Sequence, residues 1–513
     1  KPIMVIMAVC AILALMELCR RCVGIPILCV VGVLLVYTFS TVKAGKVIYD
    51  LFYASTGVMN TPINVCAKFI VVFIIFGAFL ERTGISAFFI DLANSLCGSS
   101  AGGPAKVAVI SSALCGMVSG SSVGNTVTTG SVTIPMMKKT GYKPEFAGAV
   151  EAAASTGGQI MPPIMGAAAF LMAEYMNIPY AKVAVKAILP AVLYFTGIFI
   201  AVHLEAKKLG LKGMPKSEMV SWGELAKRAY LIIPLALLIF LVSSGSRTMQ
   251  FSAAVSILAA IVVGFLNKDE RLTFGKIVEA LEAGAKGAIT VAVACAMAGM
   301  IAGCITVTGL ASILINAIVQ MAGDATMIGL LLTMICCIIL GMGVPTTANY
   351  CIMASTCAPI LVQMGFPLVA AHFFVFYFGI VADITPPVAL AAYAGAAIAK
   401  ANPMKTGINA TKLAIAAFIV PYIFAYSPAM LFDNVSSAFE VVQIVVSALI
   451  GLFGVAAALN GFVYKKIPML FRLAMAAGGL CMMIPGTASD VVGLVMVGGI
   501  VLIQRMSARR LAA

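Results

Sequence analysis

Long apolar stretches recur along the whole chain and are separated by short polar breaks. A helix needs about 20 predominantly apolar residues to cross the hydrocarbon core of a membrane. By that rule, apolar helices are predicted at 3–19, 23–42, 64–80, 86–97, 183–203, 229–245, 250–266, 284–306, 310–322, 412–432, 437–459, 467–485 and 488–504. The mixed, aromatic segment 46–62 is typical of a helix lying at the membrane interface. The pattern therefore predicts an all-α polytopic membrane protein.

Four breaks interrupt this apolar pattern near its centre. Two are rich in Gly, Ser and Thr, at 98–134 and 340–357, and two are proline pairs, Pro162-Pro163 and Pro386-Pro387. Proline removes a backbone donor and pushes the preceding residue out of the helical region. The sequence therefore predicts helices that stop and restart inside the protein, because unpaired backbone groups facing lipid would cost several kcal/mol each.

The breaks belong to an internal repeat. Five ungapped pairs share one offset: 349 − 125 = 224 for asparagine, 365 − 141 = 224 for glycine, and 359 − 135, 386 − 162 and 387 − 163 = 224 for proline. Two related halves, each with one polar break and one proline break, are typical of secondary transporters built from inverted-topology repeats. An interrupted helix exposes carbonyls that suit a hard cation and an N-terminal dipole that suits a carboxylate.

Composition excludes several other classes of protein. The 513 residues are 62% hydrophobic and only 10% charged, which is incompatible with a water-soluble globule or with disorder. The net charge of +14 does not indicate nucleic-acid binding, because the basic residues gather in the breaks and in the polar segment 205–228, predicted to be a cytoplasmic linker. The 14 cysteines and 2 histidines form no motif with metal-ligand spacing, so no transition metal and no cofactor are expected.

Ionisable residues inside apolar segments are costly and usually functional. Glu151 lies before the first proline break, and Asp383 lies three residues before the second, at the position equivalent to Gln159 (383 − 224 = 159). We expect Asp383 to exchange the coupling proton or to contribute to a sodium site, with Glu151 as a second candidate. His372, about three helical turns before Asp383, could assist a proton relay. The alternative is a structural acid hydrogen-bonded to the hairpin backbone.

The chain resembles the large membrane subunit of TRAP transporters, the tripartite ATP-independent periplasmic transporters. The resemblance covers roughly 46–430 and is carried by VSGSSVGNTVTTGSVTIPMMKKTGYKPEFAGAV at 118–150, STGGQIMPP at 155–163, VADITPPVAL at 381–390 and FGAFLERTG at 76–84. It is similar to the fused permeases, in which a four-helix small subunit precedes the large one. Such permeases work with a TAXI-type substrate-binding protein.

The resemblance implies an elevator-type transporter with two re-entrant helical hairpins that imports organic acids from a periplasmic binding protein across the bacterial inner membrane. It implies hairpin tips at 119–126 and 344–350, and cation binding, of H⁺ or Na⁺, by Ser121, Ser122, Asn125, Thr126, Thr346, Thr347, Asn349 and Thr385. The helix breaks that would line the substrate site comprise Gly157, Gly158, Gln159, Pro162, Pro163, Pro386 and Pro387. An acid at Asp383 departs from sodium-coupled members and favours the proton. The implied substrate is a dicarboxylate such as 2-oxoglutarate or glutamate.

The predicted order along the chain is a remnant of the small-subunit region at 1–45, a first repeat at 46–204, the linker at 205–228, a second repeat at 229–432 and extra C-terminal membrane helices at 433–513. On this reading most of the small-subunit region is missing. Three alternatives remain open: a dicarboxylate or citrate transporter that needs no binding protein, an integral-membrane enzyme, and a passive channel. Two distant histidines without clustered acids argue against the enzyme, and paired broken helices favour alternating access over a channel.

Overall fold

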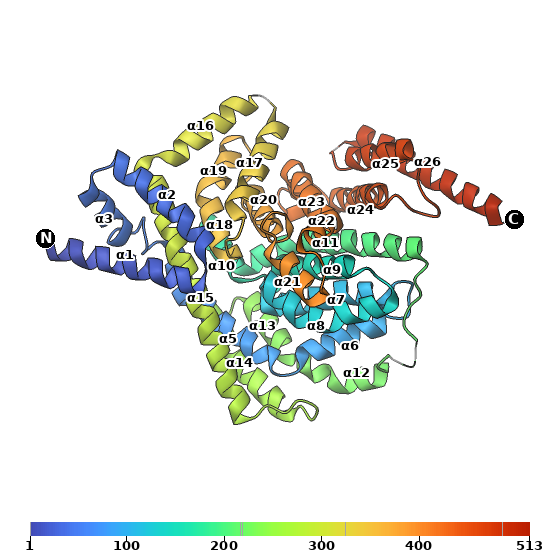
Figure 1. Ribbon diagram of the computed structural model, residues 1–513, viewed down its shortest axis with the longest axis horizontal. Coiled ribbons are helices and arrows are strands. Elements are labelled where there is room, and N and C mark those ends of the chain that lie inside the picture. Colours follow the sequence, from blue (N-terminus) through green and yellow to red (C-terminus); the bar gives the residue numbers. More distant parts are fainter. Residues whose placement is uncertain (1, 216, 218, 324, 485, 513) are drawn as a thin grey trace. The chain divides into compact units, whose positions relative to one another are not determined.

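The computed structural model describes residues 2–215, 217, 219–323, 325–484 and 486–512, with side chains through 508. Every regular element in these ranges is helical (Figure 1). Nine of the described helices are long and apolar enough to cross a membrane. Lys216 and Glu218 of the predicted linker lie outside the described residues.

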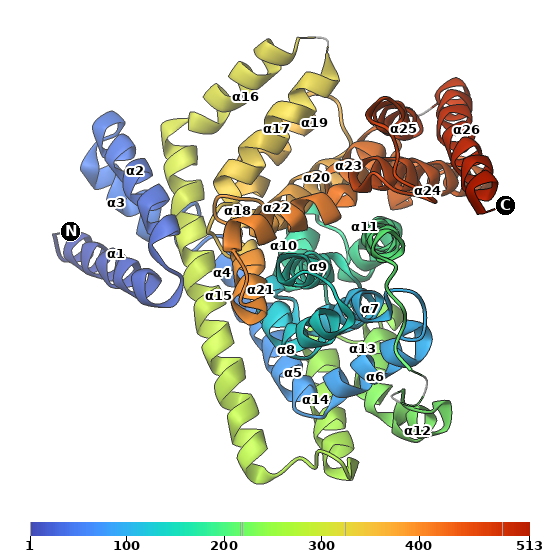
Figure 2. The ribbon, with the colours of Figure 1, turned by 45° about the vertical axis from the view of Figure 1, so that its right-hand side comes forward.

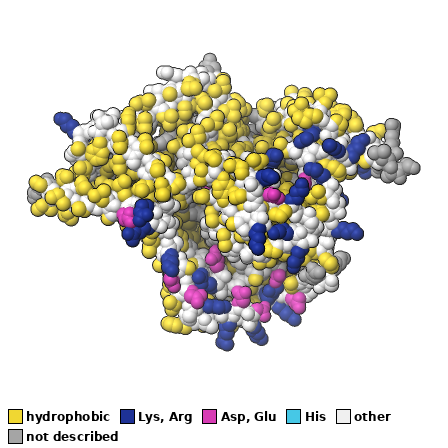
Figure 3. All heavy atoms as spheres, viewed as in Figure 1, with side chains coloured by type: hydrophobic (Ala, Val, Ile, Leu, Met, Phe, Trp, Pro, Cys, Tyr) yellow, Lys and Arg dark blue, Asp and Glu magenta, His cyan; other side chains and the backbone are white. Residues whose placement is uncertain are grey.

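The outer surface is apolar where the first helices lie. Helix α1 (Pro2–Cys22) exposes Ile3, Ile6 and Leu13 by 59% or more, and apolar side chains dominate this region in Figure 3. Water would penalise such a surface, whereas lipid accommodates it. The all-helical architecture and this surface confirm the prediction of a polytopic membrane protein.

One long helix extends beyond its predicted limits. The apolar pattern gives 284–306, whereas α15 runs from Phe274 to Thr308 and begins with a charged turn. The hydroxyl oxygen of Thr273 accepts a hydrogen bond from the backbone N–H of Lys276 at 3.3 Å and caps the helix. The apolar pattern marks only the part of a helix that suits lipid, whereas capping and helix propensity fix where the backbone starts to coil.

The chain packs as two units, each drawn from several segments. Unit 1 comprises residues 1–85, 163–184 and 229–382. Its elements are α1, α2 (Ile25–Thr41), α3 (Ala44–Phe52), α4 (Thr61–Val65), the π-helical segment η1 (Cys66–Ile70), α5 (Val71–Glu81), α10 (Ala167–Met176), the 3-10 turn η4 (Ala229–Ile232), α13 (Ile233–Ser244), α14 (Met249–Leu266), α15, α16 (Leu310–Ala322), α17 (Thr326–Gly341), α18 (Thr346–Thr356), α19 (Ala358–Gln363) and α20 (Leu368–Val381). Within it, α15 packs against α2, α5 and α18.

Unit 2 comprises residues 86–162, 185–228 and 383–513. Its elements are α6 (Ile85–Cys97), α7 (Gly103–Ser119), α8 (Ser122–Thr140), α9 (Pro144–Gly157), the 3-10 turn η2 (Gly158–Ile160), most of α11 (Tyr180–Leu209), α12 (Trp222–Arg228), the 3-10 turn η5 (Ala382–Ile384), α21 (Leu390–Ala399), α22 (Pro403–Leu413), α23 (Ile415–Tyr426), the 3-10 turn η6 (Pro428–Leu431), α24 (Ala438–Asn460), α25 (Met469–Cys481) and α26 (Thr487–Ala512). Helices α7, α8, α9 and α21 form its centre, and α24, α25 and α26 pack on one another (Figure 2).

The internal repeat is visible in the helix boundaries. Adding 224 to the limits of α9 (144–157) gives 368–381, the limits of α20, and adding 224 to η2 (158–160) gives 382–384, the limits of η5. Helix α8 starts at 122 and α18 at 346, again 224 apart. Gly141 and Gly365 both end a helical segment with positive φ, 110° and 90°. The proline breaks follow η2 and η5 in both repeats, as predicted.

Two of the places where the chain passes from one unit to the other lie at or near the proline breaks, at 162/163 and 382/383. At the first break residues 86–162 belong to unit 2 and 163–184 to unit 1, and at the second 229–382 belong to unit 1 and 383–513 to unit 2, so α10 of the first repeat lies in unit 1 and α21 of the second lies in unit 2. Each unit thus combines the helices that precede a proline break in one repeat with the helix that follows it in the other. The domain order predicted from the sequence describes positions along the chain and stays a prediction.

Close backbone contact between α9 and α21 yields a first prediction. A Cβ atom on Gly148 would lie 2.8 Å from the carbonyl oxygen of Gly395, so Gly148→Ala forces two helix backbones apart. We expect a loss of about 1–3 kcal/mol of stability, the usual cost of overpacking. Thermal unfolding in detergent measures it. Gly499→Ala on α26, where nothing lies within 4 Å, is the control. Equal unfolding temperatures for the two variants would contradict the prediction.

Candidate functional site

The first polar break forms a helical hairpin in unit 2, hereafter hairpin 1, made of α7 and α8. Helix α7 ends at Ser119, Gly120 takes a left-handed conformation with φ 61°, and α8 starts at Ser122. Glycine suits this turn because it has no Cβ to clash at positive φ. The hydroxyl of Ser121 accepts a hydrogen bond from the N–H of Gly124 at 3.2 Å and caps α8. Ser121, predicted as a cation ligand, is an exposed N-cap here.

The tip of hairpin 1 is bonded to the acid of the second proline break. The Ser122 hydroxyl donates to Asp383 Oδ2 at 2.6 Å, although 261 residues separate the two. Both side chains are buried, and a buried carboxylate requires such donors. Thr126, also buried, donates its hydroxyl to the carbonyl of Ser122 at 2.8 Å. The structure therefore brings three of the predicted residues together.

Asn125 is a buried residue at the same hairpin tip. Its Nδ2 donates to the carbonyl of Ser112 at 2.9 Å, which fixes the orientation of the amide because a carbonyl can only accept. Its Oδ1 is buried and has no hydrogen-bond partner among the described residues. The neighbouring glycines make room: a Cβ on Gly116 would collide with Gly158 and lie 3.3 Å from Asn125 Nδ2. Asn125 therefore presents one unused carbonyl-type oxygen inside unit 2.

Asn349 repeats this arrangement in unit 1. It lies in the first turn of α18, and its Nδ2 donates to the carbonyl of Gly379 at 3.0 Å. Its Oδ1 is buried and, within the described chain, has no hydrogen-bond partner. Thr346 and Thr347 occupy the same first turn. The two asparagines predicted to bind a cation thus share one geometry. In each, Nδ2 donates a hydrogen bond to a backbone carbonyl and Oδ1 has no hydrogen-bond partner among the described residues.

The remaining predicted residues line the helix breaks. Gln159 is buried in η2, and its Oε1 has no hydrogen-bond partner in the described ranges. Gly157 packs against the Tyr194 ring, where a Cβ would clash. The predicted residues of the breaks are placed as follows: Gly158, Pro162, Thr385, Pro386 and Pro387 lie in unit 2, and Pro163 lies in unit 1.

Glu151 occupies a cage of hydroxyl groups within unit 2. Its Oε1 accepts hydrogen bonds from the Ser112 and Thr129 hydroxyls and from Ser155 at 3.0 Å, and its Oε2 accepts one from Thr133. The sequence pattern indicates Glu151 but not these four partners. A signal for two of them exists: positions 122, 126, 129 and 133 of α8 are Ser or Thr at helical spacing, so they form one polar stripe in an apolar helix.

His372 is buried in unit 1, on α20. Its Nδ1 lies 2.8 Å from the hydroxyl of Tyr350, the residue next to Asn349, and the Tyr175 ring stacks on the imidazole with centroids 6.2 Å apart. Hydrogen bonds from two consecutive residues, Asn349 and Tyr350, therefore fasten α18 to α20. The relay from His372 to Asp383 stays a prediction.

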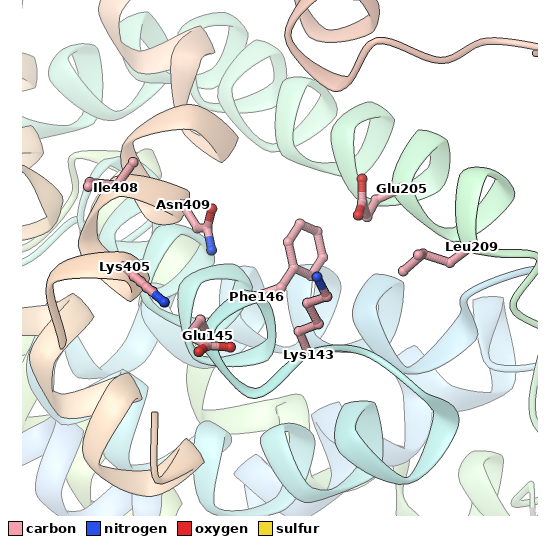
Figure 4. Close-up of a pocket in the computed structure, with 8 residues that line it drawn as sticks. All are labelled: Lys143, Glu145, Phe146, Glu205, Leu209, Lys405, Ile408 and Asn409. Carbon is pink, nitrogen blue, oxygen red and sulfur yellow. The ribbon is translucent and has the colours of Figure 1, made fainter. Parts of the chain in front are cut away.

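A charged cavity of about 370 Å³ in unit 2 was not predicted from the sequence. It is lined by Lys143, Glu145, Phe146, Glu205, Leu209, Lys405, Ile408 and Asn409, and Figure 4 shows these side chains around the opening. Two lysines face two glutamates, so the lining has no net charge and gives an anion no preference over a cation. The hairpin residues are not among those that line it.

Comparison with known proteins identifies the family. The profile described as "Tripartite ATP-independent periplasmic transporter, DctM component" matches residues 10–439. The chain belongs to this family. Family membership confirms the TRAP resemblance, and together with the apolar helices it confirms a multi-pass protein of the bacterial inner membrane. It also supports the prediction of a permease rather than an enzyme.

Curated relatives of this TRAP permease carry different substrate names. The chain is 27% identical to the C4-dicarboxylate TRAP transporter large permease protein DctM of Pseudomonas aeruginosa over 39% of this chain and 47% of that protein. It is 24% identical to the isethionate TRAP transporter permease protein DctMQ of Oleidesulfovibrio alaskensis, over 80% of this chain and 63% of the relative. It is 23% identical to the 2,3-diketo-L-gulonate TRAP transporter large permease protein YiaN of Escherichia coli, over 69% and 83%. The matched region thus spans about half of the first relative's length.

Proposed function

We propose that this chain is the large membrane component of a secondary transporter that imports organic acids delivered by a periplasmic binding protein, driven by a proton or sodium gradient. One observation carries the proposal: Asn125 and Asn349, equivalent in the two repeats, each leave a buried Oδ1 without a partner among the described residues. Leaving a buried acceptor unpaired costs about 1–3 kcal/mol. Two unpaired acceptors at equivalent helix breaks are explained if a bound ligand pairs with both oxygens.

We propose that the ligand at these two asparagine oxygens is a cation. Amide and backbone carbonyl oxygens are hard ligands, and broken helices in transporters use such groups for coupling ions. Hydroxyls of Ser122 and Thr347 lie in the first turns of α8 and α18, and that of Thr126 lies one turn further along α8. The start of each helix also carries a partial positive charge that favours a carboxylate on the substrate.

The substrate class follows from the relatives. Their names specify C4-dicarboxylates, isethionate and 2,3-diketo-L-gulonate, all small organic anions. We propose a dicarboxylate such as 2-oxoglutarate or glutamate for this chain. The proposed partners are a TAXI-type binding protein and a four-helix small-subunit region, fused or separate. One relative is named as a DctMQ permease.

An elevator movement is the proposed transport step. Such a movement requires one body of the protein to move against another, and the division into two packing units supports it. The proline pairs lie at or near the crossings between the units, and proline breaks leave backbone that can absorb changes in φ and ψ.

Uptake by purified protein in liposomes tests the function. We expect labelled dicarboxylate to accumulate only when the binding protein is present outside and a proton or sodium gradient is imposed, each gradient being applied alone in parallel samples. Uptake without any soluble protein would favour the binding-protein-independent transporter instead. Equal flux of substrate down its own concentration gradient, with no ion gradient and no binding protein, would favour a channel. Absence of flux for every small organic acid tested would overturn the proposal.

A further inference from the structure

Glu151 is a carboxyl group with no exposed surface, inside the centre of unit 2. All of its hydrogen bonds come from hydroxyl groups on α7, α8 and α9. The ion pairs found among the described residues do not include it. A buried carboxylate is costly unless it is paired or well hydrogen-bonded. The four hydroxyls therefore carry the whole compensation.

The second repeat shows that this framework does not need a carboxyl group. With the offset of 224, Glu151 corresponds to Val375, Thr129 to Met353 and Thr133 to Cys357. Helix α20 nevertheless has the limits of α9 shifted by 224, and Val375, Met353 and Cys357 are fully buried in unit 1. An apolar core therefore packs the same helices, and the acid in the first repeat serves something other than folding.

The first arm of the hairpin gives the same result. Nine positions separate Gly116 from Asn125, and eight separate Gly341 from Asn349, so the offset before the tip is 225. Ser112 then corresponds to Cys337, which is fully buried. Each hydroxyl on α7 and α8 that binds Glu151 is therefore replaced by a sulfur-containing residue in the second repeat.

The hydroxyl cage fits both protonation states of Glu151 without moving a heavy atom. When the carboxylate is ionised, each of the four hydroxyls donates its single proton to it. When the acid is protonated at Oε2, it donates to Thr133 Oγ1, and Thr133 turns its own proton to the carbonyl of Thr129, 3.1 Å away. Hydroxyl groups can exchange donor and acceptor roles in this way. Every polar group remains satisfied in both states.

The cage is connected to the proposed cation site. The carbonyl of Ser112 accepts the Asn125 amide, and the Thr129 hydroxyl lies 2.7 Å from the carbonyl oxygen of Asn125. When Glu151 is protonated and Ser112 donates to Oε1, Thr129 is released to donate to Asn125. Protonation of Glu151 thus changes the hydrogen bonds that hold Asn125 in place.

We propose that Glu151, on α9 and hydrogen-bonded to hairpin 1, is the proton-carrying group of unit 2. This inference rests on the proposed function. In each cycle one carboxylate oxygen takes one proton from water on the outer side, its charge changes from −1 to 0, and the same proton returns to water on the inner side.

Other titratable groups near Glu151 do not take this role. The helices packed against α9 include α7, α8, α21 and α22, and α11 contacts it through Tyr194. Their charged or titratable side chains are Lys106 and Cys115 on α7, Lys138 and Lys139 on α8, Tyr393 on α21, Lys405 and Lys412 on α22, and Tyr180, Lys182, Lys186, Tyr194, His203, Glu205, Lys207 and Lys208 on α11. In the part of the chain that the structure describes, none of them is a hydrogen-bond partner of Glu151. Lys106 donates to Ser100 at 3.0 Å and Lys138 to the carbonyl of Ala399 at 2.8 Å.

Glu151→Gln separates proton transport from substrate movement. The amide keeps the shape, accepts at its oxygen and donates to Thr133, so it imitates the protonated acid permanently. In liposomes containing the permease, with its binding protein outside, we expect accumulation driven by a proton gradient to fall at least about tenfold, because the amide cannot release a proton. Exchange of internal for external dicarboxylate at equal pH needs no net proton movement and is expected within about twofold of wild type.

The control is Glu145→Gln on the same helix, which removes a charge from the cavity of Figure 4. It is expected to keep proton-driven accumulation. Unchanged accumulation and pH dependence in Glu151→Gln would overturn the inference while the proposed function stands. Absence of both uptake and exchange in the wild-type protein would overturn the proposed function itself. If uptake by the wild-type protein is driven by a sodium gradient and not by a proton gradient, the inference about Glu151 is wrong while the proposed function stands.

A second variant tests the inference if Glu151→Gln does not fold. Ser112→Cys, Thr129→Met, Thr133→Cys and Glu151→Val together give the core between hairpin 1 and α9 the residues of the second repeat. We expect this protein to fold and to lose proton-driven accumulation at least about tenfold, since its buried cage contains no titratable carboxyl group. If both this variant and Glu151→Gln fail to fold, Glu151 has a structural role and the inference is wrong.

Discussion

Asp383→Asn is expected to abolish ion-driven uptake while the protein still inserts and folds. Asp383 is buried and receives the Ser122 hydroxyl at 2.6 Å, so it connects the second proline break to the tip of hairpin 1 within unit 2. Asparagine has nearly the same size, but it removes the negative charge that strengthens this hydrogen bond. A hydrogen bond contributes about 1.5–3 kcal/mol when one partner is charged and about 0.5–1.5 kcal/mol when both are neutral, so the weaker bond alone lowers transport by about tenfold. Loss of the charge that compensates the cation adds to this.

Uptake of labelled substrate into proteoliposomes measures the effect, and membrane extraction followed by size-exclusion chromatography checks that the variant is folded. Asp269→Asn is a matched control, because Asp269 is exposed in the loop between α14 and α15. Wild-type rates in Asp383→Asn would remove Asp383 from the mechanism. Loss of folding would instead favour the alternative stated for this residue, a structural acid at the hairpin.

Asn125→Ala and Asn349→Ala are each expected to weaken the dependence of uptake on the coupling cation. Each substitution deletes the buried Oδ1 together with the Nδ2 that holds it in place against Ser112 or Gly379. Losing one oxygen ligand of a charged species costs about 1.5–3 kcal/mol, so the half-saturating cation concentration should rise at least about tenfold. The maximal rate at saturating cation should change less.

A cation titration of uptake at fixed substrate measures this shift. Asn316→Ala, the same substitution at an exposed position of α16, is the control and should leave the titration unchanged. If both hairpin variants also give the wild-type titration, the hairpin tips do not bind the coupling ion. A shift in only one variant would mean that the two repeats have different functions despite their common geometry.

The repeat explains why so much of the central architecture was predictable. Pro162-Pro163 and Pro386-Pro387 interrupt helices through local backbone chemistry, which needs no tertiary contact to be inferred. The offset of 224 found between residue pairs reappears in the limits of α9 and α20. The start of α15 was missed by ten residues because apolar length reports contact with lipid rather than the extent of a helix.

The site was only partly predictable for a different reason. The sequence identified Asn125, Asn349, Glu151 and Asp383 as polar groups in apolar surroundings, because burial there has to be compensated. It could not identify which groups compensate them. Ser112 reaches Glu151 from a different helix, and Ser122 reaches Asp383 across 261 residues, so neither contact follows from helical spacing.

By itself, the sequence determined that this protein lies in a membrane, that its helices break at four places and that it consists of two related halves. These properties follow from apolar length, backbone donors and local conformation, all of which act within a few residues. Only the tertiary structure decided that each half's hairpin packs with the other half's following helix, that the equivalent Asn125 and Asn349 each keep an oxygen without a partner among the described residues, and that one repeat encloses a carboxyl group where the other encloses valine. The reason is that a buried polar group can be satisfied by any nearby partner, and packing alone determines which residues are near.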